Sequence, residues 1–149
     1  MLNRNLRWLP AVLAVPCGLI YLRAFFLPTY GVDGPFDVPG WDAFMVPIHF
    51  LLGGERVIEA FTCWLPNPLF WLAAVSMAAG FPRTAFAAAA LASLFAAYWL
   101  WVLRGFTDDF KTAGANSWLA SMLLMTVTAL IASYVRRIPS STANCDRRL

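Results

Sequence analysis

The sequence predicts an all-α integral membrane bundle of four transmembrane helices, with a short interfacial or re-entrant helical insertion between the first and second spans. Hydrophobic residues make up 60% of the 149 residues and charged residues 13%, whereas soluble domains average about 45–50% apolar and about 25% charged residues. The mean hydropathy is +0.65. The apolar residues also gather in runs, and a helix of about 20 such residues crosses about 30 Å of hydrocarbon. These features nearly exclude a water-soluble enzyme.

The first predicted span begins after two basic residues, Arg4 and Arg7. That arrangement is also typical of a cleaved signal peptide, with Cys17 in the position of a lipoprotein cysteine. However, Pro16 precedes the cysteine where a small residue is required, and the apolar run continues to Leu27. We therefore expect an uncleaved span. The four spans are predicted at residues 8–27, 61–80, 84–103 and 117–135, within a single domain of residues 1–149 that ends in a polar tail, residues 136–149.

The second span is the least regular of the four. Asn67 is suited to cap a helix that has Pro68 at its first position, and Gly80 is suited to end it. A helix from Pro68 to Gly80 would be only about 20 Å long, which is shorter than the hydrocarbon core. Either the chain enters the membrane from Phe61 through a proline kink, or the span is short and its neighbours bury it. We favour the kinked helix.

The insertion between the first two spans is predicted to form a cap of residues 29–65 on the outer side. Residues 29–40 are rich in glycine and proline and read as an aqueous loop. Residues 41–52 are apolar, too short to cross and interrupted by Pro47, so we expect a helix that lies on the membrane or dips into it. After Gly53 and Gly54, a short helix is expected to carry Glu55 and Glu59 on its polar face.

Small residues recur every fourth position in the third span, which predicts close helix packing in lipid. An adjacent row of alanines supports a central place for this helix in the bundle. We expect this small-residue row and the aromatic outer cap, with Trp41 and Trp64, to be contact surfaces. The small-residue row is Ala85, Ala89, Ser93 and Ala97.

The charges predict the orientation of the chain. Seven of the eleven basic residues fall on the side of the termini, and seven of the eight acidic residues fall on the other side. Basic residues are enriched in cytoplasmic loops, so both termini are expected in the cytoplasm. The net charge of +3 includes no basic run of the kind that follows a phosphate backbone, and no nucleic-acid partner is expected.

Two residues are candidates for a functional role. Arg23 lies inside the first span, where a charge is a functional candidate by default, although pairing with Asp37 or Asp42 is the favoured interpretation. His49, the single histidine, could ligate a haem or another pigment, but a role within an interfacial helix is favoured. No cofactor is predicted.

Four acidic residues on the outer side could provide hard oxygen ligands for a divalent cation. They match no known spacing and have basic neighbours, so solvated faces and weak ion pairs are favoured over a metal site. The four residues are Glu55, Glu59, Asp108 and Asp109. No catalytic motif is present, and the three cysteines form no C-x-x-C pair.

The overall pattern resembles that of small bacterial inner-membrane proteins. Four short spans and the entry sequence Trp64-Leu65-Pro66-Asn67-Pro68-Leu69 carry this resemblance, which implies a bacterial inner-membrane location and no particular activity. We expect a non-catalytic accessory, assembly or protective subunit that packs against a membrane partner or itself. The alternatives are a small oligomeric transporter or channel, and a haem or pigment protein that uses His49.

Overall fold

The computed structural model describes residues 9–31, 37–54, 56–104 and 112–135. Within these ranges the chain is mainly helical, so the predicted helical class is confirmed. A short hairpin of two strands interrupts the helices, in the segment that was predicted as a loop. The elements in chain order are α1 (Leu9–Ala24), β1 (Pro28–Gly31), β2 (Asp37–Pro39), α2 (Gly40–Gly53), α3 (Val57–Trp64), α4 (Pro66–Ala78), α5 (Pro82–Arg104) and α6 (Thr112–Val135).

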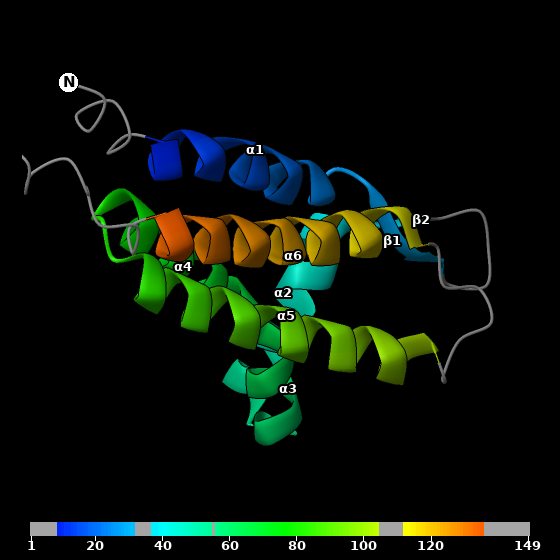
Figure 1. Ribbon diagram of the computed structural model, residues 1–149. Coiled ribbons are helices and arrows are strands. Elements are labelled where there is room, and N and C mark those ends of the chain that lie inside the picture. Colours follow the sequence, from blue (N-terminus) through cyan, green and yellow to red (C-terminus); the bar gives the residue numbers. More distant parts are fainter. Residues whose placement is uncertain (1–8, 32–36, 55, 105–111, 136–149) are drawn as a thin grey trace, which may run out of the picture.

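Helices α1, α4, α5 and α6 run side by side as a bundle (Figure 1). α6 packs against α1 on one side and α5 on the other, and α4 packs against α5 and α1. The turn between α4 and α5 contains Gly80 with a φ of 85°, a left-handed backbone that suits glycine. The third and fourth predicted spans, residues 84–103 and 117–135, lie within α5 and α6.

Two helices are long and apolar enough to cross a membrane, over Pro82–Val102 and Ala113–Val135. α1 is described over 16 residues and α4 over 13 residues, and both fall short of that length. The prediction of four spans is therefore confirmed for two helices by length and composition, and the crossing of α1 and α4 stays a prediction.

The side chains of the bundle are sorted by size. Alanine, serine and threonine fill much of the interior, together with three methionines and the rings of Tyr21 and Phe70, whereas many large apolar side chains face outward on all four helices. Soluble proteins place their large apolar residues inside. The outward residues include Val12, Val15 and Leu19 on α1, Leu72 and Val75 on α4, Leu91 and Leu94 on α5, and Val127, Leu130 and Ile131 on α6.

Two prolines lie inside helices without ending them. α1 continues through Pro16, and α2 continues through Pro47, so the predicted interruption at Pro47 is wrong. A proline inside a helix removes one backbone hydrogen bond. Pro47 is buried, and its packing together with the turns on both sides maintains the helix.

The start of α2 is held against the end of α1. The N–H of Gly40 donates to the carbonyl of Leu27 at 3.0 Å, and the N–H of Trp41 donates to the carbonyl of Phe25 at 3.1 Å. A Cβ atom at position 40 would overlap the carbonyl oxygen of Ala24. Glycine is therefore required for this close approach of the two helix ends.

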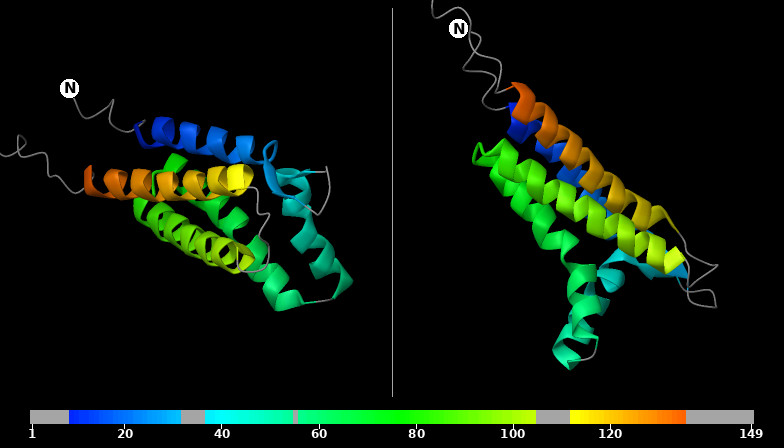
Figure 2. Two further views of the ribbon diagram at one scale, coloured as in Figure 1. Left: turned by 90° about the vertical axis from the view of Figure 1, so that its right-hand side faces the viewer. Right: turned by 60° about the horizontal axis from the view of Figure 1, so that its bottom comes forward.

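α2 and α3 pack against each other and form what we call the arm, residues 40–64. The arm projects away from the bundle in both views of Figure 2. α3 contacts α4 and α5 at its base. Gly54 ends α2 with a left-handed φ of 71°, as the sequence predicted.

We predict that enlarging a buried alanine of α5 will weaken the bundle. Ala89 is fully buried, and Ala89→Leu should lower the free energy of unfolding by about 1–3 kcal/mol because the added methyl groups have no space. Ala87 is exposed on the same helix, so Ala87→Leu is the matched control and should change stability by less than about 0.5 kcal/mol. Circular dichroism during denaturation of the detergent-solubilised protein measures both. Equal effects would contradict the packing described here.

Candidate functional site

A buried asparagine joins three helices of the bundle at a single atom. The hydroxyl of Tyr21 on α1 donates to Oδ1 of Asn67 at 2.8 Å. The indole N–H of Trp118 on α6 donates to the same oxygen at 2.9 Å. Asn67 lies in the first turn of α4 and is 7% exposed. We call Tyr21, Asn67 and Trp118 the Asn67 node.

The amide nitrogen of Asn67 compensates for a defect that the neighbouring proline creates. In a continuous helix, the N–H of residue 68 would bond to the carbonyl of residue 64, but Pro68 has no N–H. Asn67 Nδ2 donates to that carbonyl, on Trp64, at 3.1 Å. The backbone at Leu65 remains helical between α3 and α4. The two helices therefore adjoin at the prolines, with the side chain of Asn67 bridging the break.

The predicted capping role of Asn67 is wrong. α4 begins two residues earlier than predicted, at Pro66, and its N-cap Leu65 makes no side-chain hydrogen bond. The side chain of Asn67 instead turns back to the preceding carbonyl and across to α1 and α6. An asparagine in an otherwise apolar span was the signal that could have indicated an interhelical contact.

Aromatic rings cover the node. The ring of Tyr21 stacks on that of Phe70, with centroids 4.4 Å apart and an interplanar angle of 8°. Phe25 and Trp71 meet Tyr21 edge-on at 5.4 and 5.6 Å. Each polar atom of the node thus has a hydrogen-bond partner and is enclosed, and the node is suited to hold helices in register rather than to bind or transform a ligand.

Hydroxyl and thiol groups form two further contacts between helices. The hydroxyls of Ser93 on α5 and Thr126 on α6 are 3.0 Å apart. The Sγ atom of Cys17 on α1 lies 4.0 Å from Oγ1 of Thr128 on α6. Both contacts involve α6, which therefore exchanges polar contacts with α1, α4 and α5.

The small-residue row of α5 lies mostly inside the bundle. Ala85, Ala89 and Ser93 are buried and Ala97 is exposed. The chain's own helices thus cover the first three residues, which leaves them no surface for another protein.

The predicted aromatic contact residues lie on the arm. Trp41 is 54% exposed, and its ring is 5.8 Å from that of Phe25 and 5.9 Å from that of Phe44. Trp64 ends α3 and is half-buried. Among the described side chains, the indole N–H groups of Trp64 and Trp99 are buried without a hydrogen-bond partner, which is costly for a donor removed from water.

Arg23 and His49, the two candidates from the sequence, are both exposed. Arg23 lies in the last turn of α1 and His49 lies in α2. Within the described part of the chain the ion pair is Arg56 with Glu59, 4.0 Å apart, so Arg23 is not paired with Asp42. The side chain of Asp37, its other predicted partner, lies outside the described residues.

The acidic candidates for a cation site cannot be compared as a group. Glu55, Asp108 and Asp109 lie outside the described residues. Glu59 is described, is more than half exposed and faces Arg56. Among the residues with described positions, no three His, Cys, Asp or Glu side chains gather where they could hold a metal ion.

Comparisons with protein-family models, with curated proteins and with solved structures found no significant match to this chain.

We predict that the Asn67 node makes a large contribution to stability. Asn67→Ala removes the partner of the Tyr21 hydroxyl, the Trp118 indole and the Trp64 carbonyl, and should lower the free energy of unfolding by about 2–4 kcal/mol. Tyr21→Phe removes a single hydrogen bond and should cost about 1 kcal/mol. Unfolding in a detergent titration measures both.

Ser133→Ala is the control for these variants, because its hydroxyl bonds only to a carbonyl of its own helix, at 2.8 Å. Its effect should be below about 0.5 kcal/mol. If Asn67→Ala were as mild as this control, the node would not join the helices.

Proposed function

We propose that the protein is a non-catalytic integral membrane protein of the bacterial inner membrane. In this proposal four helical segments cross the membrane, both termini lie in the cytoplasm, and the chain acts as an accessory, assembly or protective subunit. It would pack against a partner membrane protein or a second copy of itself.

The sorting of side chains by size supports membrane insertion of the whole bundle. Large apolar residues face outward on α1 and α4 as well as on the two longer helices. In water such a surface would favour aggregation, whereas in lipid it is matched to the acyl chains. Small residues inside let the helix backbones approach closely, which is how helices associate in a bilayer. α4 is short, so it crosses most of the core, and the arm, which continues from its far end, joins it to the outer side.

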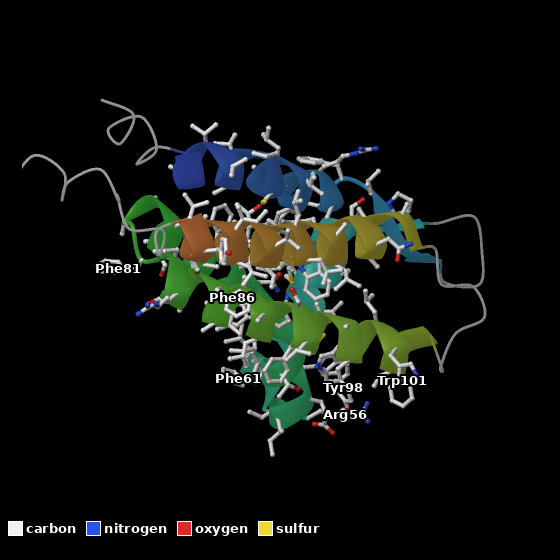
Figure 3. The ribbon with its side chains drawn as sticks, viewed as in Figure 1. Arg56, Phe61, Phe81, Phe86, Tyr98 and Trp101 are labelled. Carbon is white, nitrogen blue, oxygen red and sulfur yellow. The ribbon has the colours of Figure 1, made fainter. Side chains whose placement is uncertain are left out.

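One observation supports the proposed contact with a protein partner. α3 and α5 present exposed aromatic side chains on the same side of the molecule: Phe61 on α3, and Tyr98 and Trp101 on α5 (Figure 3). The rings of Tyr98 and Trp101 are 6.5 Å apart. Large aromatic residues are the usual anchors of protein contacts. We define Phe61, Tyr98 and Trp101 as the aromatic face.

The charge distribution supports the proposed orientation. The first turn of α5 carries Arg83, which is exposed, and the terminal segments carry six of the remaining basic residues. Basic residues near the ends of spans are retained in the cytoplasm.

We predict that a photoreactive phenylalanine analogue at position 98 will cross-link in native membranes to one defined protein, either a partner or a second copy. Tyr134 on α6 is also an exposed tyrosine of the bundle, and the same analogue at position 134 is the matched control. Mass spectrometry identifies the product. The proposal requires a product specific to position 98, and identical products at both positions or lipid adducts alone would refute the aromatic face as a protein contact.

We predict that a reporter enzyme that is active only in the cytoplasm will be active when fused after Leu149. A reporter that is active only outside the cytoplasm should be silent at the same position, because the basic tail is retained inside. The reverse pattern would overturn the orientation.

A further inference from the structure

Both helices of the arm have a polar edge on an apolar surface. On α2, Asp42 and His49 are exposed and lie seven residues apart, so they share one face two turns apart. On α3, Glu59 is paired with Arg56, and Thr62 lies one turn further along the same face. This division is typical of helices that lie in the plane of a membrane.

The remaining surface of the arm is strongly apolar, most of all near its tip. Leu52 is 82% exposed and Ile58 is 78% exposed. Phe50 and Val57 are exposed beside them. If the arm extended into water, these side chains would be solvated, and no other described element covers them.

The lengths of α4 and α5 show how far along the bundle the arm leaves it. α4 ends and α5 begins at the turn that contains Gly80, and the two helices run antiparallel. α4 has 13 residues and α5 has 23 residues, which correspond to about 20 Å and about 35 Å of helix. The base of the arm therefore lies about 15 Å short of the far end of α5. With the shared turn at one boundary of a hydrocarbon core about 30 Å thick, that base is about 10 Å inside the opposite boundary.

We propose that the arm is embedded in the plane of one leaflet, at the end of the bundle where α5 ends and α6 begins. The acyl chains and glycerol region of phospholipids are the partner of Leu52 and Ile58. The polar edge, with Asp42, His49 and the Arg56–Glu59 pair, faces the headgroups. The depth agrees with the 5–10 Å or so to which in-plane amphipathic helices bury their apolar face. This inference rests on the proposed membrane insertion of the bundle.

Depth-dependent quenching of a fluorophore tests the proposal in the full-length protein reconstituted in phosphatidylcholine vesicles. Single cysteines are introduced as Ile58→Cys and Leu52→Cys and labelled with an environment-sensitive dye. The background carries Cys63→Ser and Cys145→Ser. Cys17 is left in place because it is fully buried and should not react with the dye. Glu59→Cys is the matched control on the polar edge, and Leu94→Cys, exposed on the middle of α5, reports insertion of the bundle.

The expected result is that lipids with a nitroxide near the glycerol end of the acyl chain quench positions 52 and 58 about threefold more than aqueous iodide does, with the reverse at position 59. Position 94 should respond most to a nitroxide near the methyl end. If iodide quenches positions 52 and 58 as strongly as position 59 while position 94 stays in lipid, the arm lies in water and this inference is wrong. If neither quencher reaches positions 52 and 58, protein covers them and the inference is also wrong. If iodide quenches position 94, the bundle is not inserted and the proposed function fails as well.

Discussion

The break between α3 and α4 is the constraint on which the rest of the structure depends. Two prolines, at positions 66 and 68, remove backbone donors where the chain turns from the arm into the bundle. In an apolar environment a carbonyl without a partner is costly, and water is not at hand to supply one. The side chain of Asn67 supplies the donor to Trp64 and uses its oxygen to bind α1 and α6. One residue thus permits the bend and fixes the helices around it.

The helices of the bundle lie close together because small side chains fill much of the space between them. With alanines and serines along α5, the neighbouring helices come near enough for hydroxyl groups to meet, as Ser93 and Thr126 do. In the proposed membrane setting, van der Waals contact would replace the hydrophobic effect as the source of cohesion, because lipid solvates large apolar side chains as well as a protein core does. Many bulky residues accordingly face outward, although Tyr21 and Phe70 are buried at the Asn67 node.

Much of the fold could be predicted from the sequence, because long apolar runs bounded by glycine, proline and charge determine helix positions. The limits of α5, the end of α6 and the stop at Gly54 are examples, although α6 begins at Thr112, five residues before the predicted start. The role of Asn67 was not predictable in this way, since it depends on Tyr21 and Trp118, which lie 46 and 51 residues away in the chain. Pro47 is a second case in which the sequence was misleading. Its local propensity favours a break in the helix, and burial in the tertiary structure overrides that propensity. The hairpin also depends on pairing between segments that carry no strand pattern of their own.

The shortness of α4 has a consequence for the shape of the molecule. Near the turn at Gly80 the bundle is four helices thick, whereas toward the other end α4 is absent and the chain spreads sideways as α2 and α3 (Figure 2). The cross-section of the protein therefore changes along its length from compact to broad. If it is inserted as proposed, a body of that form displaces unequal areas from the two lipid monolayers, and it fits best where one monolayer is more expanded than the other.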